Sequence, residues 1–115
     1  MITQNSAAQT ARVKNKRLIR GLIRKGFSGK AAADAEGSCF RMMKRMKKEY
    51  VMIAFRKQDG TFCMRIGTLL PYQSFFHKQF HFLEMKGTMP YWDAEEENWR
   101  TFQIENLISW KGMGY

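Results

Sequence analysis

Positively charged side chains recur at helical spacing in the first part of the chain. Lys16, Arg20 and Arg24 follow one another at intervals of four residues, and a second group comes later, at Arg41, Lys44, Arg45 and Lys48. On a helix these spacings place the side chains of each group on one face, where they can meet successive phosphates of a nucleic acid and release its counterions. The sequence therefore predicts binding to the phosphate backbone of DNA or RNA, with little reading of base sequence.

Basic helical faces also serve other purposes. They can be solvated surfaces only, or they can bind an acidic protein or an anionic membrane. A helix-turn-helix is a sharper alternative, in which Ala33 and Gly37 form the turn and Met43 and Met46 lie buried in the following helix. Glu36 stands beside that glycine where an apolar residue is expected, and it counts against this motif.

The second part of the chain adds two candidate arginines, Arg65 and Arg100. They extend the basic surface if Ile66 and Phe102 face inward, whereas pairing with Asp93 or with the acidic residues 95–97 is an equally good use. Four aromatic residues can stack on bases, although packing in a core is their more common role: Tyr91, Trp92, Trp99 and Phe102.

Other chemistries find little support. His77, His81 and Glu84 have a spacing that would put metal ligands on one helical face, but the segment is not convincingly helical and offers no fourth ligand. Residues 21–26 have the glycine spacing of a phosphate-binding loop but lack its Lys-Ser/Thr. We therefore expect a non-enzyme with no catalytic residue, no metal and no cofactor.

The charge of the chain supports a polyanionic partner. The 115 residues include 20 Lys and Arg against 10 Asp and Glu, for a net charge of +10 and a pI near 10.0. Up to Lys48 there are 13 basic and 2 acidic residues, and beyond it 7 and 8, so all of the excess lies in the first part. A chain of this length also excludes most large enzyme scaffolds.

Cysteine use and hydropathy bear on the compartment. Cys39 and Cys63 form no CxxC or disulfide-rich pattern, which favours a reducing, cytoplasmic setting. We find no signal-peptide core and no apolar stretch near the roughly 18 residues of a membrane span, so a membrane partner is not expected.

The elements that must position these residues change character near residues 48 to 50. An amphipathic helix is expected over about 8–25, capped by Asn5 or Ser6 and ended by Gly26. A second helical segment is expected over 30–50, with Gly37-Ser38 as an interruption that divides it in two.

From Tyr50 on, the apolar period is two. Strands are predicted over 51–56 and 61–68, joined by an Asp59-Gly60 hairpin, with Phe62, Met64 and Ile66 on one face of the second. Further strands are predicted over 89–93, 99–104 and 108–111, with a 3₁₀ turn at 105–107. The connection 72–86 is aromatic-rich and is not assigned a structure. Five short strands favour a small SH3-like barrel.

Several short motifs resemble a known family. They are 55–61 (FRKQDGT), 65–69 (RIGTL), 91–93 (YWD), 99–102 (WRTF) and 105–108 (ENLI). In order and spacing they are similar to the WYL_2 family over about residues 50–110, with residues 1–48 outside the resemblance. It implies an Sm-like SH3 β-barrel and a small protein of Bacteroidota, their phages or mobile elements, and it implies no activity.

The sequence thus predicts an α+β protein: a basic N-terminal helical arm of two or three helices (1–48) and a five-stranded SH3-like, Sm-like barrel (49–115). We expect a nucleic-acid-binding accessory or regulatory protein that acts through the arm. The alternative is an assembly module of a phage or mobile element that docks on a larger protein complex, with Met42, Met43, Met46 and the aromatic connection as its contact surface. The sequence does not decide between DNA and RNA as the partner, and it leaves a homo-oligomer open.

Overall fold

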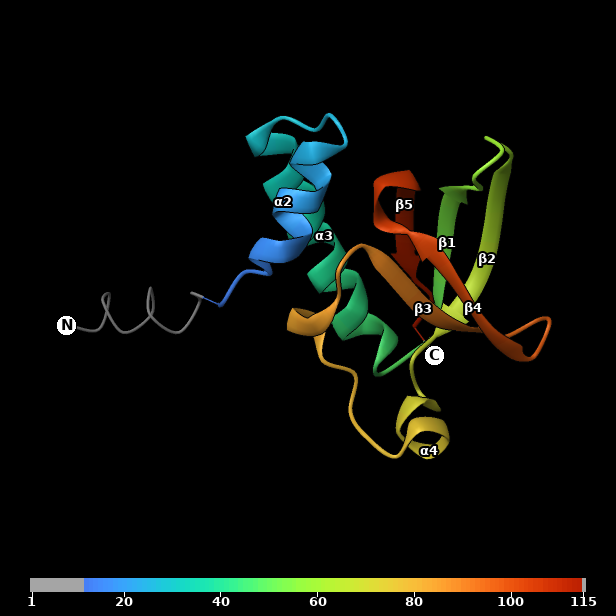
Figure 1. The fold of residues 1–115 in the computed structure, drawn as a ribbon. Coiled ribbons are helices and arrows are strands. Elements are labelled where there is room, and N and C mark those ends of the chain that lie inside the picture. The colour runs from blue at the N-terminus through green and yellow to red at the C-terminus, as the bar shows by residue number, and fades with distance from the viewer. Residues whose placement is uncertain (1–11, 115) are drawn as a thin grey trace.

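The computed structural model describes residues 12–114. Two helices come first, α2 (Lys16–Arg24) and α3 (Gly29–Met46), and five strands follow. These are β1 (Val51–Arg56), β2 (Phe62–Thr68), β3 (Thr88–Asp93), β4 (Asn98–Gln103) and β5 (Leu107–Gly112), with α4 (Tyr72–Phe76) and the 3₁₀ turns η1 (Phe82–Glu84) and η2 (Ile104–Asn106) between them. The α+β class and the change from helix to strand near residue 48 are confirmed (Figure 1).

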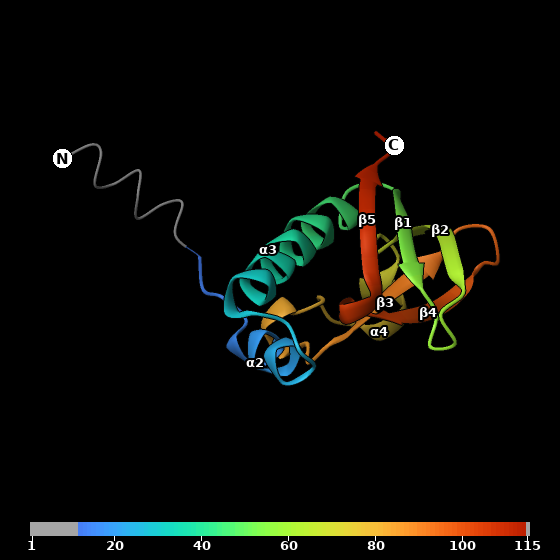
Figure 2. The same cartoon turned by 90° about the horizontal axis from the view of Figure 1, so that it is seen from above.

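The strands form one antiparallel sheet in the order β4-β3-β2-β1-β5. β3 and β4 cross the direction of β5, β1 and β2, as a sheet bent toward an SH3-like barrel does, and α2 and α3 lie together on one side of the strands (Figure 2). α3 packs against both β1 and β5, and α2 packs against α3. One apolar core therefore takes residues from the helices and from the sheet.

The first helix is shorter than expected at its start. Residues 12–15 are not helical, and α2 begins at Lys16 because the side chain of Asn15 accepts a hydrogen bond from the Leu18 N–H. The expected start over 8–11 and the caps Asn5 and Ser6 lie outside the described residues. The expected end is confirmed, since Gly26 has φ 108° and the Phe27 N–H bonds back to the Leu22 carbonyl.

The second helix is continuous, so the interruption expected at Gly37-Ser38 is wrong, as is the helix-turn-helix with its turn there. A mid-helix glycine costs only about 1 kcal/mol relative to alanine, which the buried apolar face of α3 outweighs. Ser38 also anchors the helix, because its hydroxyl accepts a hydrogen bond of 2.9 Å from the Trp110 indole of β5. The methionines expected at the surface are buried instead: Met42, Met43 and Met46.

The hairpin between β1 and β2 turns at Asp59-Gly60, as predicted, with Gly60 at φ 88°. The face assigned to β2 is wrong, however. Phe62 and Met64 are half exposed, whereas Cys63 and Gly67 are buried. The register explains this, because Cys63 pairs with buried Phe55 and directly opposed residues share one face of a sheet.

The aromatic connection between β2 and β3 covers the other side of β3 and β4. Phe75 and Phe76 of α4 lie 5.2 Å and 5.1 Å, between ring centroids, from Trp92 and Trp99 respectively. Phe75 and Phe76 remain about half exposed, whereas Phe80 and Phe82 further along are buried in the core. Within residues 12–114 no helix has the length and apolar character that crossing a bilayer requires.

Candidate nucleic-acid interface

The basic residues of α2 lie on its solvent face. The helix sequence KRLIRGLIR contains no acid. Leu18 and Leu22 are buried, whereas Ile23 is exposed. The cations of the helix are exposed as well: Lys16, Arg17, Arg20 and Arg24. The part of the chain that the structure describes provides none of these four with an acidic partner. They are therefore free to bind an anion without first breaking an ion pair.

A hollow of about 430 Å³ opens at the start of α2. Its cationic lining comes from Lys14, Lys16, Arg17 and Arg20, and its apolar lining from Val13 and Leu83, both at least half exposed. Lys14 and Arg17 were not among the predicted site residues. The signal for Arg17 was present, since it is three residues before Arg20 and seven before Arg24 on the same helix.

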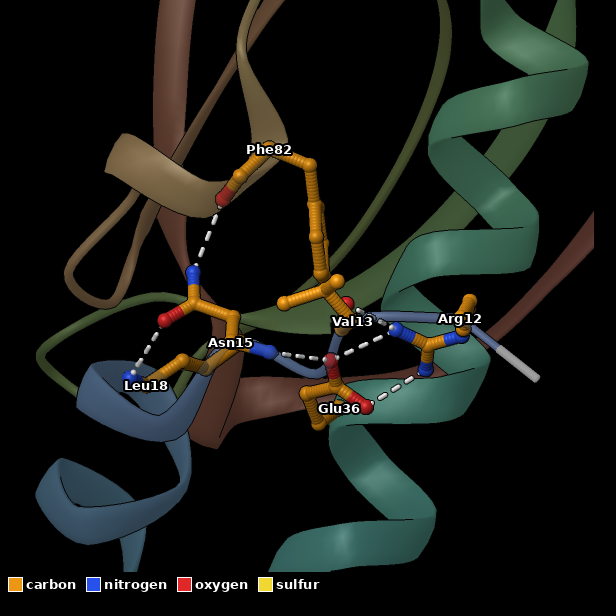
Figure 3. Close-up of polar contacts among 6 residues, drawn as sticks. All are labelled: Arg12, Val13, Asn15, Leu18, Glu36 and Phe82. Atoms are coloured by element: carbon orange, nitrogen blue, oxygen red, sulfur yellow. Dashed lines mark hydrogen bonds and ion pairs between the residues drawn. The ribbon is translucent and has the colours of Figure 1, made fainter.

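A buried polar cluster fixes the start of α2 against α3 and the η1 segment (Figure 3). The Asn15 side chain donates to the carbonyl oxygens of Phe82 at 2.8 Å and Met85 at 2.7 Å, in addition to capping the helix. The Asn15 N–H donates to the Glu36 carboxylate at 2.8 Å, and Arg12 binds both oxygens of that carboxylate. We call Arg12, Asn15 and Glu36 the clasp; it fixes the chain at Asn15, between Lys14 and Lys16, whose side chains are exposed.

The clasp is held electrostatically. Burial would raise the pKa of Glu36, but hydrogen bonds from Arg12 and from the Asn15 N–H, with the charges of Arg12 and Lys14, lower it overall. The Arg12 guanidinium also lies over the Phe40 ring, 4.1 Å from its centroid. Arg12 therefore pairs with groups of the protein itself, Glu36 and the Phe40 ring, whereas the cations of α2 have no acidic partner in the described part of the chain.

The second predicted group lies on the exposed face of α3 and just beyond the helix. Arg41, Lys44, Arg45 and Lys48 are all exposed. Arg45 is paired with Glu49 at 2.6 Å, and the Lys44 ammonium lies 5.6 Å from the centroid of the Phe40 ring. Arg41, Lys44 and Lys48 therefore have no acidic partner within residues 12–114.

The two strand arginines, Arg65 and Arg100, lie on a different face of their strands from the one expected. Both point to the buried carboxylate of Asp93, with Nε to Oδ2 distances of 3.9 Å for Arg65 and 3.3 Å for Arg100. Arg100 shares a strand face with Phe102, two residues away, and Arg65 shares one with Cys63. The expected orientation, with both arginines opposite the core face, is therefore wrong, and the pairing with Asp93 is what the structure shows.

The remaining candidates are placed as follows. Tyr91 and Phe102 are buried in the core, and Trp92 and Trp99 pack against α4. His77 ends α4, and no cluster of three potential metal ligands occurs within the described part of the chain.

The family comparison covers most of the strands. The model of the WYL_2 family, described as an Sm-like SH3 β-barrel fold, matches residues 39–108. The match begins inside α3, so the expectation that everything up to Lys48 lies outside the family is wrong for residues 39–48. Comparison with curated proteins and with solved structures found no match.

Proposed function

This chain belongs to the WYL_2 family of Sm-like SH3 β-barrels, and we propose that it binds nucleic acid through the phosphate backbone, with the cations of α2 as the main contact. The observation that carries the proposal is a helix with four outward cations and no acid, fixed to the core by the clasp. Its role is that of an accessory or regulatory protein, since binding of this kind reads little sequence.

The dimensions of α2 suit a phosphate backbone. At 1.5 Å rise per residue, the eight-residue step from Lys16 to Arg24 covers about 12 Å. One DNA strand places a phosphate about every 3.4 Å along the axis, so the helix spans three to four of them. Lys14 extends the contact beyond the helix at the hollow. Arg41 and Lys48, which are also exposed, can bind further phosphates. Binding by the α2 cations does not require them.

Anisotropy titrations test the proposal. Labelled single- and double-stranded DNA and RNA are titrated with the protein from low to high salt. We expect micromolar or tighter binding at low salt, with a log-log salt slope of about −4 for four to five neutralised phosphates. Absence of binding at low salt for all four nucleic acids would refute the proposal.

A second candidate is a module that docks on a protein complex, such as one of a phage or mobile element. It is favoured by Phe75 and Phe76, which stay about half exposed on α4 beside the two packed tryptophans. The methionines that the sequence suggests for such a surface, Met42, Met43 and Met46, are buried and do not contribute. Salt separates the two functions, because apolar docking persists at ionic strengths that abolish phosphate binding.

A further inference from the structure

A hollow of about 490 Å³ lies between the end of α2, the connection that follows α4 and the base of the β3–β4 hairpin. Among the described residues that line it, the cationic ones are Lys25, Lys78 and Lys86. Buried Phe80 and Met85 give it an apolar part. We call this space the lysine hollow. Its three lysines come from separate segments and converge on one space, where their fields add and attract an anionic group.

Two of the three lysines are unpaired. Lys25 forms an ion pair with Glu105 of η2, whereas Lys78 and Lys86 have no acidic partner within residues 12–114. One acid, Glu84, is among the lining residues, and it is exposed. The lysine hollow therefore keeps an excess of positive charge.

The kind of cation bears on the kind of anion. Arginine, with its planar fork of donors, is the preferred residue for phosphate and nucleic-acid recognition, whereas lysine is a compact point charge. The exposed arginines of the first helix, Arg17, Arg20 and Arg24, lie on α2, and the lysine hollow uses lysines instead. This difference favours a carboxylate ligand for the hollow.

The chain carries such carboxylates at the other end of the same hairpin. The turn between β3 and β4, residues 94–97, contains Glu95, Glu96 and Glu97, and all three are exposed. Within residues 12–114, Glu96 alone of the three has an ion-pair partner, Arg100 at 3.9 Å. We call residues 94–97 the acidic turn. Its three adjacent carboxylates match the three lysines of the hollow in number and in sign.

Hydrogen bonds hold the acidic turn in one conformation. Oδ1 of the buried Asp93 carboxylate accepts the backbone N–H groups of Glu95 and Glu96 at 3.0 Å each. The Asp93 carbonyl accepts the Glu97 N–H at 2.8 Å. A segment whose backbone is already fixed loses little conformational entropy when it binds. The acidic turn is therefore preorganised as a ligand.

The acidic turn does not reach the lysine hollow of its own chain. Thr88 and Gln103, which line the hollow, pair at the base of the hairpin, whereas Asp93 and Asn98 pair beside the turn. The five residues from base to turn cover about 17 Å at 3.3 Å each. Both views of the fold show the turn at the end of the sheet away from α2 (Figures 1 and 2). A second molecule, displaced along the hairpin, can place its turn in this hollow.

We propose that the lysine hollow of one molecule binds the acidic turn of a second molecule of this chain, in a head-to-tail contact. Each pair then leaves one hollow and one turn unoccupied, so the contact repeats and gives chains or rings. The net charge of +10 opposes this only weakly, because at physiological salt charges more than about 8 Å apart are largely screened. The proposal does not rest on the function proposed above.

Sedimentation velocity of the full chain at physiological salt is the first test. A contact between one turn and one hollow is small, and small interfaces are transient, so the protein is measured up to about 500 μM. We expect the average mass to rise with protein concentration and to fall again when salt is added. A wild-type protein that stays monomeric over the whole range would overturn the proposal.

Two variants identify the surfaces that meet. The turn variant carries Glu95→Gln, Glu96→Gln and Glu97→Gln, and the hollow variant carries Lys78→Gln and Lys86→Gln. All five side chains are exposed, so neither variant should lose its fold. Self-association of each variant alone should weaken about tenfold, since exposed ion pairs contribute up to about 1 kcal/mol each.

An equimolar mixture of the two variants gives the sharpest result. The turn variant keeps an intact lysine hollow and the hollow variant keeps an intact acidic turn, so one molecule of each can bind the other. We expect a one-to-one dimer that grows no further, because the remaining hollow and the remaining turn have lost their charges. A mixture that associates no better than its two components would refute the head-to-tail contact.

A charge-matched control separates the hollow from net charge. Lys57→Gln with Lys111→Gln removes two exposed lysines that do not line the hollow, and this variant should associate as the wild type does. Equal losses in the control and the hollow variant would contradict the proposal. A short single-stranded DNA is the probe for the other class of ligand. If the hollow variant binds it more weakly than the control does, while the wild type stays monomeric, the lysine hollow binds phosphates and the proposal is wrong.

Discussion

Replacement of Asn15 by alanine should be far more costly than an ordinary helix-cap change. Loss of the cap to the Leu18 N–H costs about 1 kcal/mol. The same change leaves the buried carbonyls of Phe82 and Met85 without the donor they now have, at about 1 kcal/mol each. We therefore expect Asn15→Ala to lower the free energy of unfolding by about 3 kcal/mol.

Ser28→Ala is the matched control. Ser28 caps α3 by accepting the Ala31 N–H at 3.0 Å, but it is exposed and makes no long-range contact in the described chain, so its loss should cost about 1 kcal/mol. Urea unfolding followed by circular dichroism gives both values, with equal m-values as the check on two-state behaviour. An Asn15→Ala loss no larger than that of Ser28→Ala would refute the clasp.

Two further predictions concern pH and packing. Because the folded-state pKa of Glu36 lies below its ordinary value of 4.5, its contribution to stability is present above that pH and is lost as the pH falls below it; acid titrations of stability should show a shallower slope for Glu36→Gln. Gly67→Ala should destabilise by roughly 1–3 kcal/mol because a Cβ there would lie 2.7 Å from the Tyr91 ring. Gly29→Ala, in open space, should cost nothing; equal melting temperatures for the two alanine variants would contradict this packing.

The order of elements follows from local patterns in the sequence. The spacing of apolar residues changes from a period near 3.6 to a period of two where α3 ends and the strands begin. Asp59-Gly60 marks the turn of the β1–β2 hairpin. The face of β2 could not be obtained this way, because Phe62 and Met64 are as apolar as a buried strand face. Only the register with β1, which places Cys63 opposite Phe55, decides which side is inside.

The basic surface of α2 is likewise predicted only in part, because local patterns do not show contacts between distant parts of the chain. Helical spacing indicates the outward cations of α2, since Leu18 and Leu22 need only one buried face. The start of that helix depends on Asn15, whose partners Phe82 and Met85 are 67 and 70 residues away in the sequence. A local sequence pattern does not predict hydrogen bonds between residues so far apart in the sequence.

The two strand arginines, Arg65 and Arg100, show the same limit in another form. The sequence names Asp93 as one possible partner, but it leaves an outward, solvent-facing orientation equally open. Pairing with Asp93 is decided only by the sheet, in which β2 and β4 both lie against β3. A pattern of charges along one strand is therefore weaker information than the same pattern along one helix.

The most direct measurement is the salt dependence of nucleic-acid affinity for three proteins. These are the wild type, the α2 variant Lys16→Gln/Arg20→Gln/Arg24→Gln, and a charge-matched control that carries Lys78→Gln, Lys86→Gln and Lys111→Gln instead. We expect the α2 variant to lose affinity for every sequence, with a log-log salt slope about three units less steep, while the control stays near the wild type. Equal losses in the two triple variants would show that only net charge matters, and would contradict α2 as the contact surface.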